Sequence, residues 1–272
     1  MEQAKEELME QLNEVIGHVN VVKQSNEQAK EKKLNPSYMY AVITKRVNDE
    51  DSAIKAYAAV TLSNAVTLHG IRLIESDKGM FVAMPQKQAY DSETKSGKLD
   101  EEGHPEYENI VFPITKETRE DLNKCLMDAY NSEDGYSYIS ANKNKSRAYR
   151  ITPTLYARDH ESIKASGSVE FGGFVCKDVV VALRERNDNG NLFPVVNFPN
   201  YCVEKKDGTK TYIDYMEFKE DGHGYDFTEQ VEKEKDFKLL AKNIIIKEAK
   251  KVNPEIEMLL DKDRSLDSPI KS

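Results

Sequence analysis

The chain has no tryptophan and only three cysteines in its 272 residues. Cys125, Cys176 and Cys202 are scattered and show no CxxC spacing, which excludes a disulfide framework and a cysteine-based metal site. We therefore expect buried or neutral thiols in a protein of a reducing compartment.

Long apolar runs are also missing. No stretch approaches the roughly 20 apolar residues that cross a bilayer. Glu2, Lys5 and Glu6 occupy the N-terminus, where a signal peptide would need an apolar core. These absences predict a cytoplasmic protein that makes no contact with membranes.

Positive charge is in deficit, with 39 lysines and arginines against 48 aspartates and glutamates and a formal net charge of −9. This balance argues against indiscriminate nucleic-acid binding, because an acidic surface repels phosphate. Binding of DNA or RNA would therefore need a local basic patch.

Recognisable catalytic patterns are lacking as well. The five histidines show no HxH, HxxxH or HExxH spacing, and no glycine-rich phosphate loop leads from a strand into a helix. No nucleophile has an evident base and orienting group. We expect a protein that is not an enzyme and that needs no cofactor and no metal.

What the sequence does contain is an internal repeat. Residues 53–71 and 162–180 realign on a shared Ile-Lys-Ala triplet, with an offset of 109 and no gap. Each copy then runs through a glycine turn into a strand-like run that ends in Pro85 or Pro199. A repeat of this length predicts two copies of one domain.

The two copies predict an α+β protein with two domains, each an antiparallel sheet followed by a helix, and an N-terminal helix before them. Short connections between the β-rich runs make neighbouring strands antiparallel. The expected segments are an N-terminal helical segment, a first domain, a linker, a second domain and a C-terminal tail, at residues 1–36, 37–131, 132–147, 148–251 and 252–272.

Runs of β-branched and aromatic residues mark four expected strands in each copy. They cover residues 38–47, 53–62, 65–75 and 79–84 in the first copy, and 149–157, 162–171, 174–184 and 192–198 in the second. In the third strand the apolar phase slips from even to odd positions between Leu68 and Ile71. A bulge at His69-Gly70 would restore one buried face.

The remaining segments give weaker signals. Residues 86–108 read as a long polar loop, and residues 252–272 as a charged tail. Thr115 or a neighbouring residue is placed to cap the helix that follows. Residues 211–218 indicate an additional strand, and residues 228–251 a long helix.

The N-terminal segment carries an apolar seam that steps by four and three residues. The seam consists of Leu8, Leu12, Val15, Val19 and Val22. Such a pattern is typical of a helix docked on its own domain. A short coiled coil, and with it self-association of the chain, is the alternative, although about two heptads are few for it.

The first copy, from Val42 to Tyr130, resembles the stage V sporulation protein G family of bacteria, SpoVG. The second copy keeps only the strand frame and resembles a diverged member. The residues that carry the resemblance form four motifs: Arg46-Val47-Asn48, His69-Gly70-Ile71-Arg72, Gly79 to Pro85 with the run FVAMP, and Phe112-Pro113-Ile114-Thr115 followed by Arg119.

The resemblance implies small α+β domains that pair as homodimers, so that a tandem chain would form an intramolecular pseudo-dimer. It also implies a regulator of sporulation and septation that binds DNA or RNA at specific sites. The family's nucleic-acid contacts are attributed to basic residues just after the FVAMP strand. Lys87 matches such a position, but Gln88 stands where the family has arginine, and no basic residue follows Pro199.

Seven residues are candidates for nucleic-acid contacts. Lys87, Arg72 and Arg119 match family positions, and a role of Arg72 or Arg119 in folding, through an ion pair, is the alternative interpretation. A basic patch with no acid among residues 141–150 adds four more, Lys143, Lys145, Arg147 and Arg150. In an extended chain three of these four share one face, but a solvated linker between domains is the alternative interpretation.

Two functions fit these observations. The first is a regulator that binds DNA or RNA without catalysis. The alternative is a protein-interaction or structural module that retains the fold and has lost nucleic-acid binding, which the net charge of −9 favours.

Overall fold

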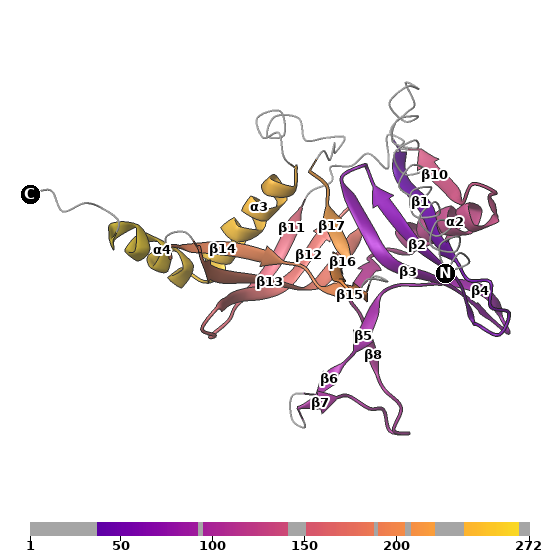
Figure 1. The fold of residues 1–272 in the computed structure, drawn as a ribbon, viewed down its shortest axis with the longest axis horizontal. Helices are drawn as coiled ribbons and strands as arrows, with labels where there is room; N and C mark the ends of the chain where they lie inside the picture. Colours follow the sequence, from indigo (N-terminus) through magenta and orange to yellow (C-terminus); the bar gives the residue numbers. More distant parts are fainter. Residues whose placement is uncertain are drawn as a thin grey trace, which may run out of the picture.

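The computed structural model describes residues 37–91, 95–140, 151–187, 190–204, 208–220 and 237–266. It is an α+β protein with two antiparallel sheets, each with helices packed against it (Figure 1). The expected N-terminal helix and the basic patch at 141–150 lie outside the described residues. Within these ranges no helix is long and apolar enough to span a membrane.

The first sheet is built from the first copy and one strand of the second. Its order is β10-β1-β2-β3-β17, and β4 also pairs with β3. The strands are β1 (Ser37–Arg46), β2 (Ile54–Leu62), β3 (Val66–Ser76), β4 (Gly79–Ala83), β10 (Tyr136–Ser140) and β17 (Met216–Phe218). The predicted antiparallel pairing of the first four is confirmed.

The second sheet has the same plan. Its order is β11-β12-β13-β14, and β9 pairs with β13. The strands are β9 (Val111–Pro113), β11 (Thr152–Ala157), β12 (Ile163–Phe171), β13 (Phe174–Glu185) and β14 (Leu192–Asn197). Each strand predicted for the second copy is therefore present to within a few residues.

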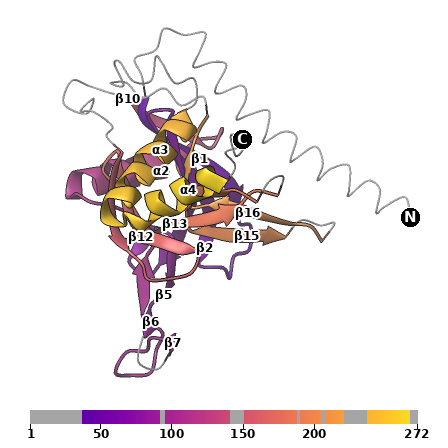
Figure 2. The ribbon, with the colours of Figure 1, turned by 90° about the vertical axis from the view of Figure 1, so that its left-hand side faces the viewer.

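In the described part of the chain, three helices lie against the two sheets (Figure 2). They are α2 (Lys116–Asn131), α3 (Phe237–Val252) and α4 (Glu255–Leu266). Thr115 caps α2 as predicted, since its hydroxyl accepts a hydrogen bond from the Thr118 amide at 3.1 Å. The expected helix over 228–251 corresponds to α3, and its first nine positions lie outside the described residues.

The predicted bulge in β3 is present. Ala58 pairs with Ile71 and Val60 with Leu68, so His69 and Gly70 together face one residue of β2. The same bulge recurs in β13, where Gly167 pairs with Val179 and Val169 with Cys176. Both bulges therefore keep the apolar residues on either side of them on one buried face.

The repeat offset needs a correction of one residue. Three residues join β2 to β3, but only Gly172-Gly173 join β12 to β13. The offset is therefore 109 before this turn and 108 after it. With that change Gly70 corresponds to Asp178, and both have positive φ, +73° and +59°.

The expected polar loop at 86–108 is a two-stranded arm instead (Figure 1). The arm contains the short ladders β5–β8 (Gln86–Gln88, Tyr107–Asn109) and β6–β7 (Tyr90–Asp91, Ser96–Gly97). A second ribbon, β15–β16 (Asn200–Glu204, Lys210–Asp214), follows Pro199, so the strand expected over 211–218 is part of a hairpin followed by β17. Backbone hydrogen bonds between paired strands order both segments. The polar composition of these residues gives no sign of this pairing.

Two boundaries also change. Residues 136–140, expected in the linker, form β10 at the edge of the first sheet. Residues 255–266, expected in the tail, form α4, which buries Ile256. The buried Lys164 carbonyl accepts a hydrogen bond from the Asn253 side chain at 2.8 Å, just before the helix. The packing of α4 depends on a strand that is distant in the sequence, so the charge pattern of residues 252–272 does not predict it.

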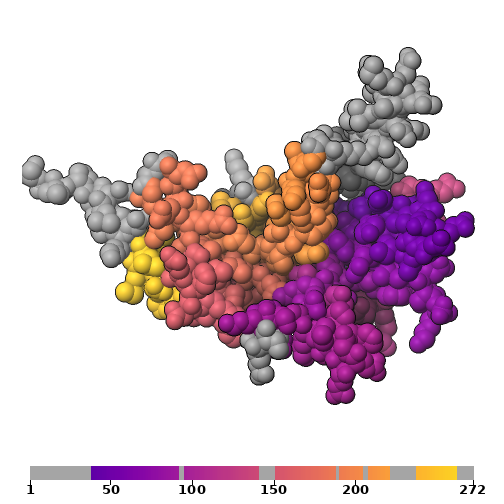
Figure 3. Space-filling model, turned by 60° about the horizontal axis from the view of Figure 1, so that its bottom comes forward, coloured from indigo at the N-terminus to yellow at the C-terminus, as the bar shows by residue number. Residues whose placement is uncertain are grey.

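The two sheets exchange strands reciprocally. β9 leaves the first copy to pair with β13, and β17 leaves the second copy to pair with β3. The Ile114 amide donates to the Gly173 carbonyl and the Lys219 amide to the Ala65 carbonyl, both at 2.9 Å. In the space-filling view the orange segment of the second copy lies against the indigo surface of the first (Figure 3). Each sheet is therefore completed by the other half of the chain.

Four phenylalanines of the second half pack β17 against the second sheet. Phe218 of β17 lies 5.8 Å from Phe171, 5.5 Å from Phe198 and 5.9 Å from Phe237, measured between ring centroids. These rings come from β12, from the residue that follows β14 and from α3, and all four are buried. One apolar cluster thus holds β17, which is a strand of the first sheet, against the second sheet.

We expect only one of the three thiols to react in the native protein. Burial raises the pKa of Cys125 to about 12 and also raises that of Cys176, so neither forms the reactive thiolate near pH 8. Cys202 is exposed on β15. Titration with a chromogenic disulfide should release one equivalent per native chain and three per denatured chain. Rapid release of three equivalents without denaturant would contradict the buried positions.

Candidate nucleic-acid interface

Lys87, the residue that matches the family's basic position, is engaged in ion pairs. Its ammonium lies 2.6 Å from Asp178 of β13 and 3.4 Å from Glu108 of β8. Burial disfavours its charge, but the two carboxylates outweigh this and raise its pKa. Lys177 also reaches Glu108, at 3.7 Å. Two cations and two carboxylates therefore offset each other where the arm meets the second sheet.

The corresponding position in the other ribbon has no charge. Tyr201 stands two residues after Pro199, as Lys87 stands two residues after Pro85. Its ring lies 5.0 Å from that of Tyr215, which packs against the backbone of Gly70. Where one half has the ion pair of Lys87 with Asp178, the equivalent positions of the other half thus have aromatic rings that pack on Gly70.

Arg72 and Arg119 lie on opposite faces of the first sheet. Arg72 alternates with the buried Ile71 and Leu73, so it points to the face away from α2, and its charge acts on Tyr215. Arg119 lies in the first turns of α2 and is half-buried. The structure therefore does not bring Lys87, Arg72 and Arg119 together into one site.

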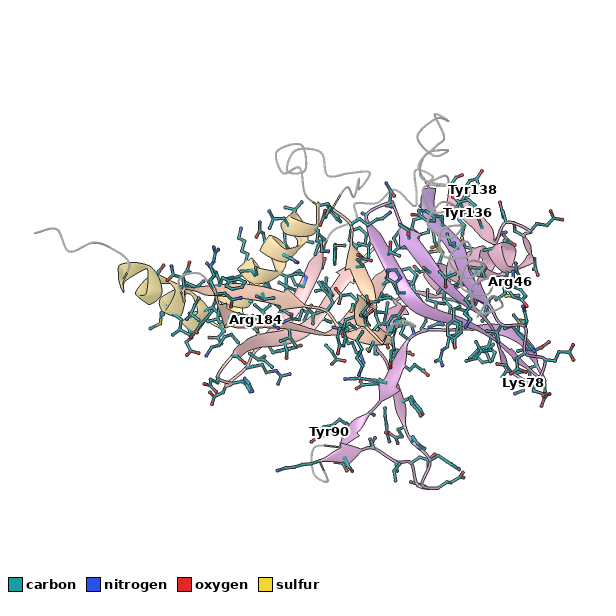
Figure 4. The ribbon with its side chains drawn as sticks, viewed as in Figure 1. Arg46, Lys78, Tyr90, Tyr136, Tyr138 and Arg184 are labelled. Atoms are coloured by element: carbon teal, nitrogen blue, oxygen red, sulfur yellow. The ribbon has the colours of Figure 1, made fainter. Side chains whose placement is uncertain are left out.

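Arg46, another residue of the family motifs, has a clear structural contact. Its guanidinium donates to the carbonyls of Tyr130 and Ser132 at 2.8 and 3.0 Å and lies over the Tyr130 ring (Figure 4). These carbonyls end α2, and the last turn of α2 has no basic residue of its own. Arg46 thus supplies the cation that the C-terminus of a helix favours.

A small group of lysines lies near β17, although the chain as a whole is acidic. A hydrogen bond from His69 lowers the pKa of Glu217, burial opposes this, and the charges of His69, Lys238 and Lys219 lower it further. Burial raises the pKa of Asp214 nearby, against the charges of Lys238 and Lys242. Three lysines therefore surround two carboxylates at this edge, and sequence reasoning did not select Lys219.

Tyrosines line the open face of the first sheet beside these cations. Tyr138 pairs with Tyr40 and Tyr136 with Val42 across β10 and β1, so all four side chains point to the same side. Figure 4 shows Tyr136 and Tyr138 on β10. Sequence reasoning missed this row because Tyr136 and Tyr138 were placed in the linker.

The chemistry of these groups is that of a binding surface. In the part of the chain that the structure describes, no cluster of three histidine, cysteine or acidic side chains could hold a metal ion. The arrangement offers cations, tyrosine rings and neutral hydroxyls, which suit binding better than bond-breaking chemistry.

Comparisons with known proteins place the resemblance in the first copy. The SpoVG family model matches residues 39–132. A protein of Borreliella burgdorferi is 36% identical over 92 residues, which are 33% of this chain and 81% of the relative. One of Fusobacterium nucleatum is 33% identical over 92 residues, 34% of this chain and 85% of the relative. The names of both contain the words septation protein SpoVG.

A third relative, from Agathobacter rectalis, has the same words in its name. It is 29% identical over 85 residues, 31% of this chain and 83% of the relative. These matches cover about a third of the chain, so the rest of it, including the second sheet, goes beyond what is similar to these relatives.

Proposed function

Since the chain belongs to the SpoVG family, we propose that it is a regulatory protein of the cytoplasm that binds DNA or RNA without catalysing a reaction. The observation that carries the proposal is the gathering of Lys219, Lys238 and Lys242 beside β17. Local cations of this kind can release counterions from phosphates even on a protein with an acidic total. A role in septation or sporulation is part of the same proposal.

A protein-interaction module is the second candidate. It is favoured by the pairing of Lys87 with Asp178 and Glu108, which removes the free cation that the family resemblance leads one to expect. The acidic total of the chain points the same way. The two candidates differ in whether the chain binds nucleic acid at low salt.

Replacing Asp178 with asparagine should strengthen nucleic-acid binding. Asparagine tolerates positive φ as aspartate does, so the bulge should survive while Lys87 loses its closest counterion. Each additional phosphate contact steepens the plot of log Kd against log salt by about 0.7–0.9. Fluorescence anisotropy of the full chain with labelled DNA and RNA pools, at salt concentrations from about 25 to about 200 mM, measures this slope.

Glu185→Gln is the matched control, because it makes the same charge change on the same strand at an exposed position. It should leave the slope near that of the unchanged protein. If neither the unchanged protein nor Asp178→Asn binds either pool at the lowest salt, nucleic-acid binding is excluded and the interaction module is favoured.

We further infer that the two halves form an intramolecular pseudo-dimer, with the second half a diverged SpoVG-like copy. The support is the reciprocal pairing of β9 with β13 and of β17 with β3. The shared bulge and the two ribbons after Pro85 and Pro199 add to it. A family protein of one domain would need a second copy to complete such a sheet.

A further inference from the structure

We propose that the open face of the first sheet binds single-stranded nucleic acid by stacking bases on Tyr40, Tyr136 and Tyr138. The inference rests on the proposed function and adds to it the surface and the type of strand. It concerns a face made by β10 and β1, well separated in sequence from the arm that carries Lys87.

The face is defined by the alternation of side chains in β1. Met39 and Ala41 are fully buried in the core that includes Leu122 of α2. Tyr40 lies between them in the sequence and therefore points to the opposite side of the sheet. The face that carries Tyr40 is thus the one that α2 does not cover.

The three rings form a continuous row. The ring centroids of Tyr40 and Tyr136 are 5.9 Å apart, and those of Tyr136 and Tyr138 are 6.2 Å apart, with interplanar angles of 39° and 36°. Tyr138, at the outer end, is 50% exposed. Bases of a single strand stack on rings presented in this way with little sequence preference, because every base has a π face.

The row is electrically suited to a polyanion. Lys219 brings its ammonium to 3.5 Å from the Tyr40 hydroxyl and 3.3 Å from the Asn64 side-chain oxygen. Its charge also reaches Glu217, beside which Lys238 lies. A strand whose bases lie on the tyrosines would therefore have cations for its phosphates at one end of the row.

The geometry favours a single strand over a duplex. A duplex keeps its bases inside its own stack, and its major groove accepts a helix or a ribbon, not the flat face of a sheet. Exposed rings on a sheet instead take up unstacked bases, as in single-strand binding modules. Ala59 and Thr61 of β2 lie on the same side of the sheet, since they pair with Val42 and Tyr40, but Thr61 is buried, so the open part of the face is the edge made by β10 and β1.

The absence of tryptophan makes a direct test available. Tyr138→Trp places a single indole at the outer end of the row, and Tyr156→Trp places one on β11 of the second sheet, where Tyr156 is 64% exposed. Titration of the full chain with single-stranded DNA and RNA 12-mers of mixed sequence should quench the first indole to saturation. The second indole should not respond.

Affinity gives the complementary measurement. Tyr138→Ala and Tyr138→Leu should each raise the Kd for these 12-mers by about 5- to 100-fold, the range expected for a lost base stack. Tyr156→Ala should change it less than about twofold, and duplexes of the same sequences should bind more weakly than the single strands. Thermal unfolding of each variant checks that the fold is intact, and the leucine variant retains the bulk of the side chain.

The possible outcomes distinguish a failure of the proposed tyrosine surface from a failure of the proposed nucleic-acid binding. If the unchanged chain binds the oligonucleotides and the Tyr138 variants bind equally well, the surface is overturned and the proposed function stands. If the chain binds no nucleic acid at low salt, the proposed function fails and the surface with it. If the indole of the Tyr138→Trp variant responds instead to protein concentration alone, the face is an interface between copies and the inference is overturned.

Discussion

Replacing Phe218 with alanine should lower the free energy of unfolding by about 3–5 kcal/mol, the range for removal of a buried phenylalanine ring. Phe218 is 3% exposed and packs against three other rings of the second half, where β17 meets the second sheet. The cavity would open between elements from distant parts of the chain. The second sheet cannot collapse into this cavity by moving β17, because β17 is also held by its pairing with β3.

Urea unfolding followed by circular dichroism measures this loss. The matched control is Phe81→Ala on β4, where the ring is 46% exposed and its removal should cost much less. Equal midpoints for the two variants would show that the phenylalanine cluster does not stabilise the fold. A separate early transition in Phe218→Ala would show that the lost stability falls mainly on the docking of β17, and with it of the first sheet, onto the second sheet.

Cutting the chain between its two halves should leave them associated. A protease recognition sequence inserted between Ser140 and Ile151 allows the folded, full-length protein to be cleaved at one place. The halves are joined by the β9–β13 and β17–β3 ladders. Separation would leave the edges of β3 and β13 unpaired.

Size-exclusion chromatography of the cleaved protein should therefore give one peak at the volume of the uncut chain. In the same concentrated denaturant the cleaved sample should elute later than the uncut chain, because it then consists of separate chains of about half the length. Elution of the cleaved protein at the volume of a half-length chain under native conditions would contradict the intramolecular pseudo-dimer. An uncut sample with the same insertion controls for an effect of the insertion itself.

Much of the local structure could be predicted because its causes are local. The phase slip between Leu68 and Ile71 required a bulge, and the bulge is there. Thr115 caps α2 because a hydroxyl at that position satisfies a free amide of the first turn. The repeat predicted two sheets with the same strand order, but its alignment has to be shifted by one residue after the turn between the second and third strands.

The candidate site was less predictable. The match to family positions suggested Lys87, but its partner Asp178 lies on a strand 91 residues away in the sequence. The family motif around Arg46 gave no sign that this residue caps the end of α2. Tyr136 and Tyr138 looked like linker residues, since an edge strand of five residues has too short a pattern to be told from a polar loop.

The sequence by itself determined the strands, the bulge, the capped helix and the doubling of the unit, because each depends on side-chain periodicity and backbone preference within a few residues. Only the tertiary structure decided which half completes which sheet, which cations are paired and which aromatic rings share an open face. Those features depend on register and contact between distant segments. A short strand such as β9 or β17 carries no periodic signal that identifies its partner.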